Sequence, residues 1–275
     1  MNEQETRKLF DALLHSDTEE AVITHLKAAK LWDDPKVWRL YGDLENNYSP
    51  AGNQQSRSDA ALIEKLVNSI DARLMNGCLV AGIDPEGPNA PTTIREAVAQ
   101  FIEKHPKPSS ESVGRIRDWT PDFRSKVARD ITLAATGARP KEGKPCFTIA
   151  DCGEGQTPDR FPETLLSLNR SNKLRIPFVQ GKFNMGGTGV FKFCGTHNLQ
   201  LVLSRRNPAL IAKKGGAPSD LKWGFTIVRR ENPEGNRWSS IYTYLAPLGA
   251  DKTSKQGGVL RFDADALPIF PELSK

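Results

Sequence analysis

Residues 61–72 read Ala-Leu-Ile-Glu-Lys-Leu-Val-Asn-Ser-Ile-Asp-Ala and carry the most structural information in the chain. Their apolar residues recur with the period of a helix, which places Glu64, Asn68 and Asp71 at i, i+4 and i+7. At ~100° per residue these three side chains fall within an arc of roughly 60° and form one polar ridge. Polar groups that border a buried face cost stability unless they are hydrogen-bonded or bind something, so we expect this ridge to hold a metal ion and a water molecule. The apolar ridge expected beside it consists of Ile63, Val67, Ile70 and Leu74.

A second motif follows a short run that reads as a buried strand, Cys146-Phe-Thr-Ile-Ala150. The run ends at Asp151, where the sequence becomes Asp-Cys-Gly-Glu-Gly. An acid is thereby placed at the strand end, ahead of Gly153 and Gly155, and glycines let the backbone approach a ligand closely. Residues 151–155, here called the acid corner, therefore suit the binding of a nucleotide base.

A third motif is rich in glycine and spans residues 180–190, Gln-Gly-Lys-Phe-Asn-Met-Gly-Gly-Thr-Gly-Val. Glycines supply positive φ angles and exposed N–H groups, which can wrap around phosphates. The glycines of this segment are Gly181, Gly186, Gly187 and Gly189.

In this order the three motifs resemble those of the GHKL superfamily of ATPases, which includes gyrase B, the ninety-kilodalton heat-shock chaperones, sensor histidine kinases and the MutL/MORC group. The resemblance covers roughly residues 58–83 and 146–230. It implies the α/β Bergerat fold, an α+β two-layer sandwich in which helices lie on one face of a mixed, mostly antiparallel sheet. Each motif alone has a plain alternative: a solvated helix face, an Asx-capped turn or a mobile loop. The ordered set, with a strand containing Thr226 after it, favours the family.

The resemblance also implies roles for the motif residues. Glu64 would be the general base that orients the attacking water, and Asn68 would place its side-chain oxygen on Mg²⁺. Asp71 would support the adenine-side hydrogen-bond network from the same helix. The other nucleotide-binding residues follow by position: Asp151 on the adenine amino group, Gly153 and Gly155 beside the base, Gly181, Gly186, Gly187 and Gly189 on the phosphates, Lys182 as a charge in this lid, and Thr226, with Thr243 as the alternative, in a water-mediated adenine contact.

The remaining segments define the expected organisation. Residues 3–45 are expected to be helical, with Ser16 and Glu19 as a capping box. We therefore divide the chain into a helical N-terminal extension over residues 1–50 and an ATP-binding domain over residues 51–275. Residues 46–57 read as a turn-rich link.

Eighty positions separate Asp71 from Asp151, more than compact family members use. We interpret the excess as a helical insertion at about 84–145, with helices that begin at Thr93 and Thr120. After the glycine-rich segment, strands are expected at 199–204, 222–230 and 238–246.

Composition restricts the function class. A hydrophobic content of 38% in 275 residues is enough for one sizeable core. The net charge of +5 is only mildly basic, which is more typical of a solvated surface than of a nucleic-acid interface. No run of 18 apolar residues occurs and the N-terminus is too polar for a signal peptide, so we expect a cytoplasmic protein without membrane contacts.

Together these features favour a module that binds Mg-ATP, hydrolyses it slowly and uses lid closure to switch contacts with a protein partner, an additional domain or a second protomer. A non-hydrolysing ATP sensor and a histidine-kinase-type phosphotransfer domain are the alternatives. Glu64 favours the ATPase because a sensor needs no base. In family ATPases a lysine or arginine for the γ-phosphate often comes from a second domain, and we expect it to be missing here or supplied by another chain.

Overall fold

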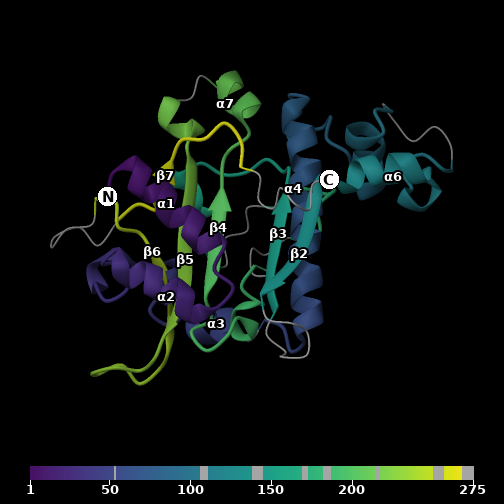
Figure 1. The fold of residues 1–275 in the computed structure, drawn as a ribbon. Helices are drawn as coiled ribbons and strands as arrows, with labels where there is room; N and C mark the ends of the chain where they lie inside the picture. The colour runs from purple at the N-terminus through teal and green to yellow at the C-terminus, as the bar shows by residue number, and fades with distance from the viewer. Residues whose placement is uncertain are drawn as a thin grey trace.

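The computed structural model describes residues 1–52, 54–105, 111–137, 145–168, 173–181, 187–214, 217–249 and 257–267. Helices combine with two antiparallel sheets, a larger one of five strands and a two-stranded hairpin beside it (Figure 1). None of the helices in these ranges combines the length and the hydrophobicity needed to cross a lipid bilayer.

In the larger sheet the main order is β1-β6-β5-β4, and β7 also pairs with β5. All of its strand pairs are antiparallel. The strands expected after the glycine-rich segment are confirmed as β4, β5 and β6. The five strands are β1 (Trp38–Leu40), β4 (Gln200–Ser204), β5 (Trp223–Glu231), β6 (Ile241–Leu245) and β7 (Leu260–Phe262).

Side chains alternate between the two faces of β5 and enter two separate cores. Phe225 and Ile227 pack with residues of α1 (Glu3–Leu14) and α2 (Glu19–Ala28), which cover one face (Figure 1). Val228 packs on the opposite face with residues of the short helical elements α3 (Tyr48–Gly52), η6 (Pro158–Glu163) and η7 (Phe191–Phe193). Helical elements therefore lie on both faces of this sheet, and the expectation of helices on one face is corrected.

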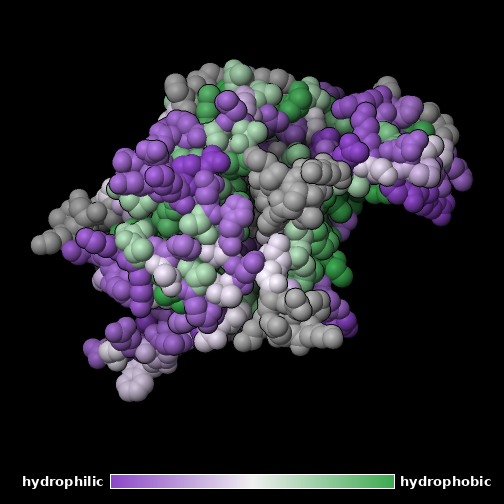
Figure 2. Space-filling view, viewed as in Figure 1, coloured by the Kyte–Doolittle hydropathy of each residue, from purple (hydrophilic) through white to green (hydrophobic). Residues whose placement is uncertain are grey.

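The smaller sheet pairs β2 (Ile131–Gly137) with β3 (Pro145–Asp151). The structure thus confirms the strand ahead of Asp151, but this strand is not buried, because Phe147 is 52% exposed. Figure 2 shows hydrophobic colour over this hairpin and the neighbouring helix. The strand β2 lies inside the segment expected to be a helical insertion, which is a second correction. At the coarser level, a mixed α/β fold with antiparallel sheets is confirmed.

The polar-ridge segment belongs to the long helix α4 (Ser58–Val80), as predicted, and α4 packs against β2 and β3. Its apolar ridge differs from the prediction. Leu74 is 2% exposed, but Ile63 is 58% exposed and Ile70 is 41% exposed. The C-terminal half of α4, rather than one continuous stripe, meets the core.

The segment between α4 and β2 contains both predicted helix starts. Thr93 caps α5 (Ile94–Ala97) and Thr120 caps α6 (Pro121–Ala128), each by accepting a backbone N–H three residues ahead. A π-helical turn, η3 (Val98–Ile102), continues α5 and packs with Leu74 and Cys78 of α4. This cluster fixes the half of α4 that follows the polar ridge. The other short elements are η1 (Pro35–Val37), η2 (Tyr41–Asp43), η4 (Ile116–Asp118), α7 (Pro208–Lys214) and η8 (Pro218–Leu221).

Residues 3–45 are only partly helical, since they also supply the strand β1. The second helix is capped by Thr18, which accepts the backbone N–H of Ala21, and not by Ser16. The Ser16 hydroxyl donates instead to the carbonyl of Ala12. A Thr two residues closer to the helix meets the same need for an acceptor at the first turn.

Asn47 joins the N-terminal segment to the sheet. Its amide nitrogen donates to the carbonyls of Tyr41 at 3.0 Å and Tyr242 at 2.8 Å, and its oxygen accepts the Tyr242 N–H at 2.8 Å. The side chain is fully buried, so no water can replace it. Asn47→Ala should therefore lower the free energy of unfolding by about 2–4 kcal/mol in urea denaturation. Asn46→Ala, an exposed neighbour, is the control, and an equal loss in both variants would contradict the expectation.

Candidate functional site

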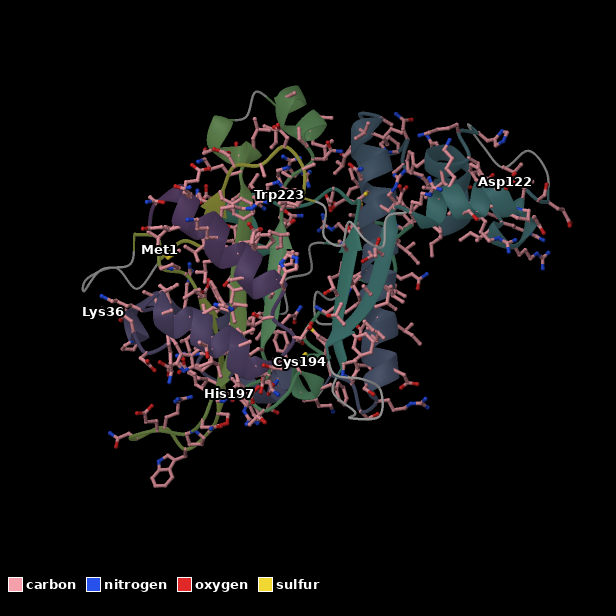
Figure 3. All side chains as sticks on the ribbon, in the orientation of Figure 1. Met1, Lys36, Asp122, Cys194, His197 and Trp223 are labelled. Atoms are coloured by element: carbon pink, nitrogen blue, oxygen red, sulfur yellow. The ribbon has the colours of Figure 1, made fainter. Side chains whose placement is uncertain are left out.

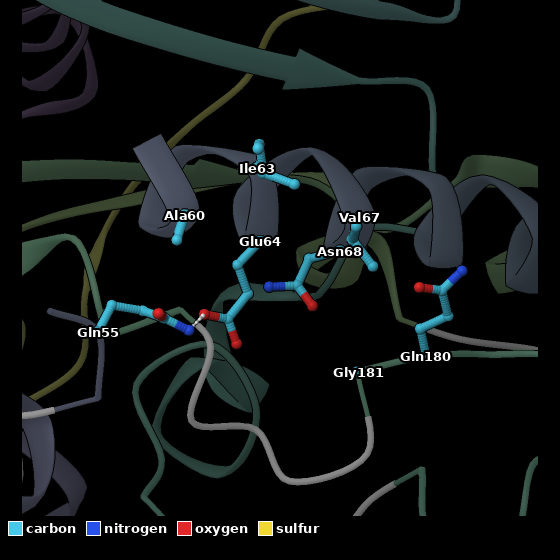
Figure 4. Close-up of a pocket in the computed structure, with 8 residues that line it drawn as sticks. All are labelled: Gln55, Ala60, Ile63, Glu64, Val67, Asn68, Gln180 and Gly181. Carbon is cyan, nitrogen blue, oxygen red and sulfur yellow. Dashed lines mark hydrogen bonds between the residues drawn. The ribbon is translucent and has the colours of Figure 1, made fainter. Parts of the chain in front are cut away.

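The polar ridge of α4 lines a cleft, shown in Figure 4. Glu64 and Asn68 face Gln180 and Gly181, where the glycine-rich segment begins. The volume of the cleft is ≈ 370 Å³, within the range of about 300–1,000 Å³ typical of small-molecule sites. Its lining consists of Gln55, Ala60, Ile63, Glu64, Val67, Asn68, Gln180 and Gly181.

Asp71 fixes the start of the glycine-rich segment to α4. Both carboxylate oxygens accept the backbone N–H of Gln180 at 3.0 Å, and one accepts the N–H of Gly181 at 2.7 Å. The carboxylate is buried, and its residue is 1% exposed. A Cβ atom at position 181 would lie 2.6 Å from Asn68 Oδ1, so a larger residue there would force the Asn68 side chain to shift. Glycine at this position therefore permits the contact between the segment and the helix.

Gln55 positions the carboxylate of Glu64. Its Nε2 donates to Glu64 Oε2 at 2.9 Å, which leaves the other oxygen able to accept from water (Figure 4). A Cβ atom at Gly189 would lie 2.9 Å from Gln55 Cγ, so the same glutamine also borders the end of the glycine-rich segment. Gln55 was missed in the sequence because it lies in the turn-rich link, outside every motif. Gln180 could have been found, since it directly precedes the first glycine.

The acid corner docks on another side of α4. The hydroxyl of Ser69 forms a hydrogen bond with Asp151, and the N–H of Gly153 donates to Asp151 Oδ1 at 2.9 Å. The N–H of Glu154 donates to the carbonyl of Ala72 at 3.2 Å. Although part of the Asp151 surface is exposed, burial of its carboxyl group raises its pKa, and the two hydrogen bonds oppose that rise. The carboxylate is thus only partly satisfied and can accept another donor.

The far side of the acid corner packs against the end of β4. Arg206 Nη1 donates to Glu154 Oε2 at 2.6 Å and to the carbonyl of Gly155 at 2.9 Å. The N–H of Asn207 donates to the carbonyl of Glu154 at 2.9 Å. Gly155 has a φ of 59°, and a Cβ atom there would overlap the carbonyl oxygen of Arg205. Conformation and close approach therefore both require glycine at position 155.

The structure does not gather every predicted site residue. Asp151 is not among the residues that line the cleft around Glu64. Thr226 is fully buried in β5, where its hydroxyl donates to the carbonyl of Leu245 at 2.7 Å. The alternative, Thr243, donates to Glu231 Oε1 at 3.0 Å. Lys182 and Gly186 lie outside the described residues.

The donors at the cleft suit a hard cation such as Mg²⁺, which binds oxygen ligands and commonly takes only one or two from protein, the rest coming from water and phosphates. Asn68 supplies an amide oxygen at the edge of the cleft. Within the described ranges, no group of three His, Cys, Asp or Glu side chains is placed to hold a metal by itself. A metal ion here would therefore take the rest of its coordination from water or from a ligand's phosphates.

Comparison of the chain with protein-family models, with curated proteins and with solved structures finds no match. The geometry of the site is therefore the basis for assigning a function.

Gly155 and Gly235 form a matched pair for testing the acid corner. Both have a φ of 59°, but a Cβ atom at Gly235 meets nothing within 4 Å. Alanine should cost about 1 kcal/mol at either position for its left-handed conformation, and at Gly155 it must also displace Arg205. Gly155→Ala should thus destabilise the protein by at least 1–3 kcal/mol more than Gly235→Ala in thermal or urea unfolding. Similar losses in the two variants would show that the corner is not packed as described.

Proposed function

We propose that this protein is a GHKL-type ATP-binding module with a Bergerat-like site that binds Mg-ATP and hydrolyses it. One observation carries the proposal: within Glu64–Asn76, the helix α4 presents the polar ridge and also binds the two other motifs. Asp71 holds Gly181 of the glycine-rich segment. Ala72 accepts the N–H of Glu154, and Asn76 donates to the carbonyl of Cys152, both in the acid corner. The acid corner and the glycine-rich segment, which are distant in sequence, thereby meet the same thirteen residues of one helix.

The acid corner is the proposed adenine site. The adenine amino group is a hydrogen-bond donor, and the partly satisfied carboxylate of Asp151 is a matching acceptor. Gly153 lies against Ala72, where a Cβ atom would come within 2.6 Å of the Ala72 Cβ. Glycine at this position lets the backbone of the acid corner lie directly against α4, which holds Asp151 beside the helix.

The cleft around Glu64 is the proposed phosphate side. Glu64 Oε1 would accept a proton from the attacking water, while the hydrogen bond from Gln55 orients the carboxylate. Asn68 would hold Mg²⁺, which neutralises charge on the phosphates when it is bound. The backbone N–H groups at Gly187 and Gly189 would donate to phosphate oxygens.

The proposed output is the one implied by the resemblance to the GHKL ATPases. Movement of the glycine-rich segment would switch contacts with a protein partner, a further domain or a second protomer. Asp71 supports such coupling, because the side chain that accepts the Gly181 N–H belongs to the helix proposed to face the nucleotide.

Asp151→Asn tests the adenine site. We expect ATP affinity to fall by about 10–100-fold in calorimetric titration, since loss of a charged acceptor costs on the order of 1.5–3 kcal/mol. The preference for ATP over GTP should decrease as well, because the carboxylate would recognise the adenine amino group by accepting its hydrogen bond. Asp122→Asn, at an exposed acid on α6 labelled in Figure 3, is the control. Unchanged affinity and unchanged base preference in Asp151→Asn would exclude this assignment.

Glu64→Ala separates binding from chemistry. We expect ATP affinity to change by less than about threefold while turnover falls by about 10²–10⁴-fold, the usual contribution of a general base. Asp59→Ala removes another acid from the first turn of the same helix and should leave turnover unchanged. Equal turnover in wild type and Glu64→Ala would instead favour a non-hydrolysing ATP sensor, in which the Glu64 carboxylate only accepts the hydrogen bond from Gln55.

A further inference from the structure

Lys65 lies in a row of residues on α4 that faces the acid corner. At ~100° per residue, Lys65, Ser69 and Ala72 fall within roughly 60° of each other on the helix. Ser69 is 4% exposed and bonds to Asp151, and Ala72 binds Glu154. Lys65 is the N-terminal member of this row, about 10 Å along the helix axis from Ala72.

The amine of Lys65 reaches the end of the glycine-rich segment. A Cβ atom built on Gly187 would lie 3.9 Å from Lys65 Nζ. The other end of the segment, Gly181, lies against Asn68 and Asp71 on the neighbouring side of the helix. Gly181 and Gly187 therefore both lie beside α4 between residues 65 and 71, and Lys65 supplies the cation beside Gly187.

Lys65 has no matching acid close enough for an ion pair among the described residues. Burial lowers the pKa of its amine to about 8, and Cys194 and Glu64 are the neighbouring groups that favour its charged form. Figure 3 labels Cys194 near the end of the β2–β3 hairpin, and its thiol donates to the carbonyl of Val190 at 3.2 Å. Lys65 as a residue is only partly buried, so its amine is accessible to an anion, and a bound anion would offset the cost of its desolvation.

Other cations near the proposed adenine site are already paired. Arg73 Nε lies 2.6 Å from Asp130 Oδ2, and Arg206 Nη1 lies 2.6 Å from Glu154 Oε2. The charge of Lys173 lies near Asp151 and opposes the rise in the pKa of that carboxyl group. Lys65 differs from these three cations because it lies beside the glycine-rich segment, where its amine forms no ion pair with a described residue.

From these contacts we infer that Lys65 is the cationic residue that binds the phosphates of the nucleotide, carried on the same helix as Glu64. The inference rests on the proposed binding of ATP. A base at Asp151 and Gly153 and phosphates at Lys65 and Gly187 would place the nucleotide along α4. The chain would then contribute a phosphate-binding lysine of its own, without one from a second domain or another chain.

Lys65→Met keeps the length of the side chain and removes the charge. In calorimetric titration with Mg²⁺ present, we expect the variant to bind ATP about 10–100-fold more weakly and adenosine within about twofold of wild type. Lys65→Arg should recover part of the ATP affinity, because it restores the charge. Lys36→Met, at an exposed lysine labelled in Figure 3, should match wild type for both ligands.

The outcomes separate the two proposals. ATP affinity unchanged in Lys65→Met, or an equal loss for ATP and adenosine, would overturn the role of Lys65 and leave ATP binding intact. Failure of the wild-type protein to bind either ligand would overturn the proposed function itself.

A second measurement needs no variant. Acylation of Lys65 in the wild-type protein can be followed by mass spectrometry at pH 8, and ATP with Mg²⁺ should slow it several-fold whereas adenosine should not. Equal labelling rates with ATP and with adenosine would overturn the inference, even if Lys65→Met did not fold.

Discussion

The carboxylate of Asp71 is buried in the middle of α4, where water cannot solvate it. Two backbone N–H groups, from Gln180 and Gly181, replace that water, and they lie 109 and 110 residues further along the chain. Hydrogen bonds to a charged group contribute about 1.5–3 kcal/mol each, and leaving a buried carboxylate without them costs more. The helix and the glycine-rich segment must therefore reach their native positions together. Glu64, Asn68 and Gly181 share one cleft as a consequence of this bond.

Much of α4 and its surroundings could be predicted from local sequence. The period of residues 61–72 identified the helix, and Thr93 and Thr120 identified two further helix starts, because a cap and a helical repeat act within a few residues. The strands β4, β5 and β6 were also predicted, since they are longer than β1 and β7, and β5 and β6 are rich in β-branched and aromatic residues. The contact of Gly181 with Asp71 was not predicted, because it joins segments 110 residues apart.

The elements that were missed depend on partners distant in the sequence. The strand β1 has three residues and exists because it pairs with β6, and β7 likewise pairs with the start of β5. The strand β2 contains two adjacent alanines and lies within a segment with helix caps, so nothing local distinguished it from helix until β3 paired with it. Ile63 and Ile70 follow the helical period, yet they are exposed because the core beside α4 forms around Leu74 and Cys78 instead. Partners distant in the sequence therefore decided the type of β2 and the buried face of α4.

Charge balance explains how these features could act as one site. Glu64 and Asp71 place two carboxylates on the helix face where a polyphosphate would lie, and like charges at such distances repel. Backbone N–H groups offset the charge of Asp71, and the amide of Gln55 donates to Glu64. The polyphosphate itself needs added positive charge, which a divalent ion at Asn68 and the amine of Lys65 would supply from adjacent faces of the helix. Because Lys65 directly follows Glu64 in sequence, its side chain points about 100° away, so it would bind phosphate without forming an ion pair with the proposed base.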